Sequence, residues 1–185
     1  MMHDSTKWLI GDSIIVVLAF ILLGFLHHPF LFSYPLHKLL HITGGILLLG
    51  NIIVTGIWMF MSERTQNADV LRFVACTVNW ADVFFTVPGV FLLITNGDIM
   101  AEQWGGPLKT SWTVVSIAIF VLSGIIWIGM LLRYQNNLIT LSNTEGAQPG
   151  PQFFAILHRW YFWGALATVL PLMSLVIMFF KPTLW

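Results

Sequence analysis

The stretch LHKLLHITGGILLLGNIIVTGIWMFM, residues 36–61, decides the fold, because it is long and apolar enough to cross a lipid bilayer as one helix. A hydrocarbon core about 30 Å thick needs about 20 apolar residues, and the spanning segment must satisfy its own backbone hydrogen bonds. Four further runs meet this condition, at residues 8–26, 77–95, 111–132 and 153–180. We therefore predict an all-α fold, a polytopic membrane bundle of five transmembrane helices.

The composition agrees with a membrane protein. Of the 185 residues, 57% are hydrophobic and 9% are charged, against roughly 45–50% and about 25% in a soluble domain. The 8 basic and 8 acidic residues cancel, which leaves no basic surface for nucleic acid. Partners are expected in the membrane: lipid, a quinone or another redox protein, with a homo-oligomer left open. The single cysteine, Cys76, cannot form an internal disulfide and is interpreted as a small core residue.

The pattern divides the chain into two parts and suggests an orientation. Residues 1–35 are predicted to form an N-terminal transmembrane helix and an outer loop, and residues 36–185 a four-helix membrane core. Turn signals place loops at residues 27–35, 62–69, 96–107 and 142–151. Basic residues on the N-terminal side are Lys7, Arg64, Arg72, Arg133 and Arg159, against Lys38, Lys109 and Lys181 on the other. This bias predicts a bacterial-type inner (plasma) membrane protein with the N-terminus cytoplasmic and the C-terminus outside.

Polar and small residues recur at helical spacing inside the spans. In the segment 36–61 they are His37, His41, Gly44, Asn51 and Thr55, and from residue 77 onward they are Asn79, Asp82, Thr86, Gly89 and Asn96. The two later spans add Ser116 and Ser123, and Gly164, Thr168 and Ser174. Because polar groups are costly in lipid, these faces should turn to the bundle interior. The Pro88-Gly89 pair is predicted to kink the second of these helices. Helix packing through small and amide side chains is the alternative explanation.

Asp82 is the only carboxylate deep within a predicted span. A carboxylate there must be protonated, paired or beside water. The residue is therefore a candidate for proton handling, with helix packing as the alternative.

His37 and His41 are four residues apart, so both rings point to the same side of a helix, about 5.4 Å apart along it. A single metal ion such as zinc or copper could take both rings with ligands from other helices. A haem would take one ring axially and leave the other for a propionate or a substrate. Gly44 and Gly45 favour haem, because glycine permits close approach of a macrocycle. Interfacial histidines beside Lys38 are the alternative.

His158 is a third candidate ligand at a different depth. Helical rise puts it roughly 30 Å from His41, so the two cannot flank one iron. Either His158 serves a second haem near the inner face, with Arg133 or Arg159 close to the propionates, or it is an interfacial residue. A second axial ligand at the depth of His41 would come from His27, His28, Met178 or Lys181.

The sequence also resembles a known family. The run from Leu36 to Gly45, the run from Leu49 to Trp58, and later landmarks resemble the small integral membrane proteins catalogued as domain of unknown function 2269. Those landmarks are Asp82, Pro88-Gly89, Thr95-Asn96-Gly97, Trp112, Ser123 to Trp127, Gln135, Trp163-Gly164 and Met178 to Pro182. The resemblance covers residues 36–182, which makes the first span an addition to a four-helix core.

That family is in turn distantly similar to HemJ-type protoporphyrinogen oxidases and to CopD-like copper-resistance proteins. The HemJ-type proteins are haem-containing four-helix membrane proteins with an essential histidine early in the core and a basic residue on a later helix. The similarity implies that His37 or His41 fills the first role and that Lys181 or Arg159 is a candidate for the second. It implies a haem-b membrane bundle more directly than protoporphyrinogen oxidation itself.

Three functions remain open from the sequence. The first is a redox protein with one or two haem b groups, a membrane oxidoreductase that exchanges electrons with a quinone or a membrane partner. The second is copper handling by His37 and His41 with Met178 or Met100. The third is a cofactor-free accessory or assembly subunit of a membrane complex. No nucleophile triad, phosphate-binding loop or paired-carboxylate pattern points to a hydrolase or a nucleotide-driven enzyme.

Overall fold

The computed structural model describes residues 7–11, 14, 32–144 and 149–185, and in this part the regular structure is helical, without strands. The first predicted span, residues 8–26, lies largely outside the described residues, as do His27 and His28. The remaining four spans are confirmed as helices long and apolar enough to cross a membrane. They are α2 (Tyr34–Glu63), the run α3 (Ala68–Ala81), η1 (Asp82–Thr86) and α4 (Val87–Ala101), the run α5 (Ser111–Ile126), η3 (Trp127–Leu131) and α6 (Leu132–Thr144), and α7 (Pro151–Phe180).

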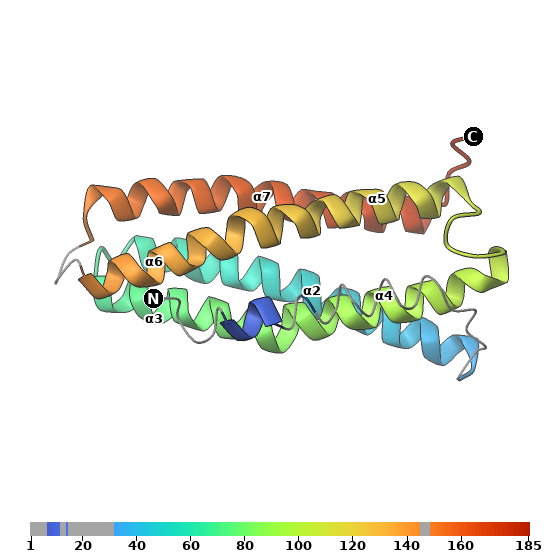
Figure 1. Ribbon diagram of the computed structural model, residues 1–185, viewed down its shortest axis with the longest axis horizontal. Coiled ribbons are helices and arrows are strands. Elements are labelled where there is room, and N and C mark those ends of the chain that lie inside the picture. The colour runs from blue at the N-terminus through green and yellow to red at the C-terminus, as the bar shows by residue number, and fades with distance from the viewer. Residues whose placement is uncertain (1–6, 12–13, 15–31, 145–148) are drawn as a thin grey trace.

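The four long helices form two closely packed pairs. Figure 1 shows α2 beside α4 and α5 beside α7, and these two contacts are the most extensive in the described part. The start of α2, the connection from α4 to α5 and the end of α7 lie together at one end of the bundle. We call it the lysine end, after Lys38, Lys109 and Lys181. The opposite end, with Arg64, Arg72 and Arg159, is the arginine end.

The loop predicted over residues 96–107 is wrong in its first half. Helix α4 continues to Ala101, and a short 3₁₀ turn, η2 (Glu102–Trp104), follows. Asn96 and Gly97 were taken as turn residues, but an end there would leave backbone groups unpaired in an apolar setting. The reversal occurs instead at Gly105 and Gly106, whose φ angles of 85° and 114° suit glycine. This correction places Asn96 and Gly97 on the helix face that α2 contacts.

The predicted irregularity at Pro88 takes the form of a π-helical turn. The five residues Asp82–Thr86 form η1, and Pro88 follows in the first turn of α4, where its missing N–H is tolerated. A second π-helical turn, η3, interrupts the run from α5 to α6. In α7 the ring of Pro171 frees the Ala167 carbonyl, and Ser123 Oγ donates to it at 2.7 Å. The breaks are thus repaired by local widening or by a neighbouring helix.

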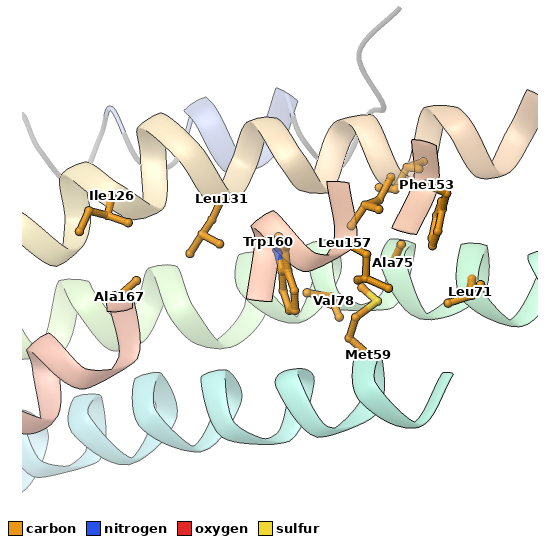
Figure 2. Packing of buried hydrophobic residues seen from close by; sticks show 12 residues of the cluster. Met59, Leu71, Ala75, Val78, Ile126, Leu131, Phe153, Leu157, Trp160 and Ala167 are labelled. Atoms are coloured by element: carbon orange, nitrogen blue, oxygen red, sulfur yellow. The ribbon is translucent and has the colours of Figure 1, made fainter. Parts of the chain in front are cut away.

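The apolar core is concentrated towards the arginine end. Figure 2 shows Phe153 and Leu157 of α7 against Leu71, Ala75 and Val78 of α3, all at most 1% exposed. Towards the lysine end, the buried face of α2 carries His37, Gly44 and Asn51 as well as Leu48. Apolar packing therefore holds one end together, whereas glycine contacts and polar side chains join α2 to α4 elsewhere.

Candidate functional site

The backbones of α2 and α4 touch at Gly44 and Gly89. A Cβ atom at Gly44 would lie 2.6 Å from the Gly89 carbonyl oxygen, and one at Gly89 would lie 2.9 Å from the Gly44 carbonyl oxygen. The close approach that we had assigned to a macrocycle at Gly44 is therefore made by helix α4. At Gly45 the nearest atom outside its own helix would be Leu93 Cδ2, at 3.9 Å. The glycine contact brings the polar faces of the two helices into register.

His37 is buried and uses both ring nitrogens within the fold. The side chain of Asn96 donates through Nδ2 to the Leu92 carbonyl, so its Oδ1 is the acceptor that faces His37 Nδ1, at 2.8 Å. The other ring nitrogen, Nε2, accepts from the Phe32 backbone N–H at 3.3 Å. His37 is 1% exposed. It therefore ties the start of α2 to α4 and offers no lone pair to a ligand in this arrangement.

His41, one turn further along α2, is half-buried and only partly satisfied. Its Nδ1 lies 2.8 Å from the Leu93 carbonyl oxygen, which can only accept, so Nδ1 carries the proton. The neutral ring then has its lone pair on Nε2, and no partner for Nε2 is found among the described residues. The ring rests on Gly97, where a Cβ atom would lie 3.0 Å from Cε1. Histidines that bind metals are commonly fixed through their other nitrogen in this way.

The remaining ligand candidates lie in other surroundings. His158 is at the arginine end, with Nε2 3.3 Å from Glu63 Oε1 and a side chain that is 67% exposed. Tyr161 donates to the same carboxylate at 3.0 Å, and Arg159 is exposed. Lys181 ends α7 at the lysine end, where its Nζ lies 4.7 Å from the ring centre of Trp104 and 5.3 Å from that of Trp112. Met178 is half-buried.

No metal cluster links these candidates. Among the described residues, no group of three His, Cys, Asp or Glu side chains is placed to hold a metal ion. Along α2, Glu63 is about 33 Å beyond His41, by helical rise. Because His158 contacts Glu63, the two histidines belong to opposite ends of the bundle.

Asp82 is the centre of a second polar site, at the first residue of η1. Its Oδ1 accepts from Asn51 Nδ2 at 2.9 Å and from Thr86 Oγ1 at 2.8 Å. Its Oδ2 accepts from Gln135 Nε2 at 3.1 Å. Asp82 is 5% exposed. Both carboxylate oxygens thus accept from neutral donors.

The donors to Asp82 come from separate elements. Asn51 lies on α2, Thr86 ends η1 and Gln135 lies on α6. The carboxylate itself begins a π-helical turn, and π-turns within α-helices are frequent at functional sites. The site joins α2 and η1 to α6.

Comparison with known families agrees with the resemblance seen in the sequence. Residues 35–182 match the model of the family described as predicted integral membrane protein, DUF2269. The chain belongs to this family. Membership establishes an integral membrane protein, and the match covers all four helices of the DUF2269 core described above. No curated protein and no solved structure matches the chain.

Two residues of the sites, Gly97 and Gln135, were not predicted as site residues. Gly97 was assigned to a loop, although it packs against His41 on α4. Asn96 was predicted both as a turn residue and on the polar face of its span, and its contact with His37 confirms the second prediction. Gln135 contributed to the family resemblance, but its approach to Asp82 spans two helices and leaves no periodic signal in the sequence. A usable signal was the spacing from Gly89 to Gly97, which follows the helical period through the supposed turn.

Proposed function

We propose that this protein is a haem-b-binding membrane redox protein in which His41 Nε2 is the axial ligand. The supporting observation is the hydrogen bond from His41 Nδ1 to the Leu93 carbonyl, which leaves the Nε2 lone pair without a described partner. Haem b would supply a one-electron couple, with a quinone or a membrane redox protein as the exchange partner. The residues present fit an axial ligand of this kind.

The chain's own residues orient the ligand. The Leu93 carbonyl fixes the ring tautomer and plane, and Gly97 gives the ring room against α4. We assign one haem to this site rather than two, because His158 is exposed and paired with Glu63. Lys181 lies at the same end of the bundle as His41 and is the candidate for holding a propionate. A Cβ atom at Gly45, unlike one at Gly44, would have no backbone atom of another described helix within 4 Å.

A cofactor-free accessory subunit is the second candidate function. It is favoured by His37 and Gly44, since both are explained by contacts between α2 and α4 alone. Copper handling has less support, because both ring nitrogens of His37 are engaged within the fold. The two candidates with support differ in one observable property, the colour of the protein.

The orientation forms part of the proposal. The arginine end would face the cytoplasm of a bacterial-type inner membrane, and the lysine end with His41 the outer side. The charge distribution supports this choice, because Arg64, Arg72 and Arg159 gather at one end. A partner of His41 would then approach from the outer half of the membrane.

The deciding experiment is a reduced-minus-oxidised absorption spectrum of the purified protein from cells supplied with ample haem. We expect a b-type signal in the parent, its loss in His41→Gly and its partial return when imidazole is added to that variant. His158→Ala, at the opposite end, is the matched control and should keep the full signal. A colourless parent, or a signal that survives His41→Gly, would overturn the proposal and favour the accessory subunit.

A further inference from the structure

Asp82 is a buried carboxylate without a cationic partner. Asn51, Thr86 and Gln135 are all neutral, and no lysine, arginine or histidine pairs with Asp82 in the part of the chain that the structure describes. Titratable side chains on the surrounding elements include His41 on α2, Cys76 on α3, Asp98 on α4, Arg133 and Tyr134 on α6, and Tyr161 on α7. Arg133 is exposed. An ionised Asp82 would therefore leave a net charge inside the bundle, stabilised by dipoles alone.

Gln135 provides the second observation. Its Nε2 donates to Asp82 Oδ2, whereas its Oε1 is sealed from solvent and has no hydrogen-bond partner among the described residues. A buried acceptor without a partner is uncommon and costs stability. Rotation of the carboxamide by half a turn would exchange the two atoms and bring Oε1 to Oδ2. That contact is favourable only when a proton lies between the oxygens.

We propose that Asp82 is a reversible proton-binding site and that Gln135 is the side chain that adapts to its two states. In the ionised state Gln135 Nε2 donates to Oδ2, as in the structure. On protonation, a proton from water forms an O–H bond at Oδ2, the N–H···Oδ2 hydrogen bond breaks, and Oδ2–H donates to Gln135 Oε1. Nothing is oxidised or reduced, and the charge of the site changes from negative to neutral.

The rest of the site suits this change. Asn51 and Thr86 donate to Oδ1 and need not move, so the carboxylate keeps its position in both states. Asn51 also donates to Thr86 Oγ1 at 2.9 Å, which holds the two donors together. By helical rise Asn51 is about 15 Å from His41 along α2, towards the arginine end. The inference does not depend on haem, because none of its contacts involves His41.

Infrared difference spectroscopy of the full-length protein in lipid nanodiscs tests the proposal. Spectra at acid minus alkaline pH should contain the C=O band of a protonated carboxyl group, and Asp82→Asn should remove that band. Asp69→Asn, an exposed carboxylate in the first turn of α3, is the control and should leave the band in place. Haem propionates would remain in both variants and so cannot imitate the loss. Difference spectra that are identical in the parent and Asp82→Asn would overturn the proposal.

Two further variants test the proposal independently if Asp82→Asn fails to fold. Thr86→Val removes one donor to the ionised form and should raise the pH midpoint of the band by about one unit. Gln135→Leu removes the proposed acceptor and should move the band to the higher frequency of a carboxyl group without a hydrogen bond. A midpoint and a frequency that both stay at parent values in these folded variants would also overturn the proposal.

Discussion

His41 and Asp82 both lie on helix faces with a polar pattern, but their surroundings leave different groups unsatisfied. Asp82 receives hydrogen bonds from three side chains on three elements, and it is 5% exposed. His41 makes one hydrogen bond, to a backbone carbonyl, and is half-buried. The first site is closed around its charge, whereas the second keeps a lone pair that a ligand can use.

The same distinction separates His41 from its neighbour His37, which is four residues earlier on the same helix face. The two rings have the same chemistry, but Asn96 and the Phe32 backbone occupy both nitrogens of His37. Their spacing suggested a shared role, but His37 is a structural residue and only His41 remains a candidate ligand. What decides between them is the second ring nitrogen: the Phe32 N–H donates to Nε2 of His37, whereas no described residue hydrogen-bonds to Nε2 of His41.

The largest effect in this comparison is expected from Asp82→Ala. Loss of the carboxylate breaks three buried hydrogen bonds, from Asn51, Thr86 and Gln135, and leaves a cavity; hydrogen bonds in membrane proteins are worth roughly 0.6–1 kcal/mol each. We expect the free energy of unfolding in mixed micelles to fall by about 3 kcal/mol. Asp82→Asn keeps one acceptor and should cost about 1 kcal/mol. Equal losses in the two variants would show that the donors find other acceptors and that the site is not closed.

The next largest effect is expected from His37→Ala. It removes a fully buried ring and leaves Asn96 Oδ1 and the Phe32 N–H unpaired, which should lower the free energy of unfolding by about 2 kcal/mol. The haem content of the folded fraction should stay at the parent level. His41→Ala should do the opposite, with loss of haem and a small change in stability of the apoprotein. A variant of His37 that folds but loses haem would contradict the division between the two rings.

Much of the fold follows from the sequence because the bilayer imposes strong constraints. Apolar runs of sufficient length predicted all four spans that the structure describes. The ends were less accurate, as at Asn96 and Gly97, because turn propensities measured in water lose their force where backbone groups cannot reach solvent. Pro88 predicted a kink in this helix, but not that it would take the form of a π-helical turn at Asp82–Thr86.

The sequence predicted the central residue of each site but not the groups that contact it. His41 and Asp82 stand out in the sequence, because polar groups within apolar runs are rare. Their partners do not, since the Leu93 carbonyl, Gly97 and Gln135 come from other helices and depend on how those helices rotate about their axes. Gly44 is an example. Its small size correctly predicted that another group packs closely against α2, but the sequence did not show that this group is helix α4 rather than a cofactor.

Gly44→Ala tests that helix contact. The added Cβ atom would lie 2.6 Å from the Gly89 carbonyl oxygen and 2.8 Å from the Leu93 nitrogen, so the backbones of α2 and α4 must separate. We expect a loss of about 1–2 kcal/mol in the free energy of unfolding, as in other overpacked cores. Gly45→Ala is the matched control, because its Cβ would be 3.9 Å from Leu93 Cδ2. Equal stability of the two variants would show that the helices do not cross at Gly44.

The smallest effect on stability is expected from Gly97→Ala. This variant tests whether His41 is the haem ligand. The new Cβ atom would lie 3.0 Å from Cε1 and 3.1 Å from Nδ1 of the imidazole, so the ring must move by a few tenths of an ångström. A side chain yields more easily than a helix backbone, so the free energy of unfolding should change by less than about 1 kcal/mol. The shift strains the hydrogen bond to the Leu93 carbonyl, which orients the lone pair on Nε2. If His41 is the axial ligand, haem affinity should fall while stability is nearly unchanged. Haem titration of the apoprotein measures this affinity. An affinity equal to that of the parent would show that the contact with Gly97 does not position the ring for haem.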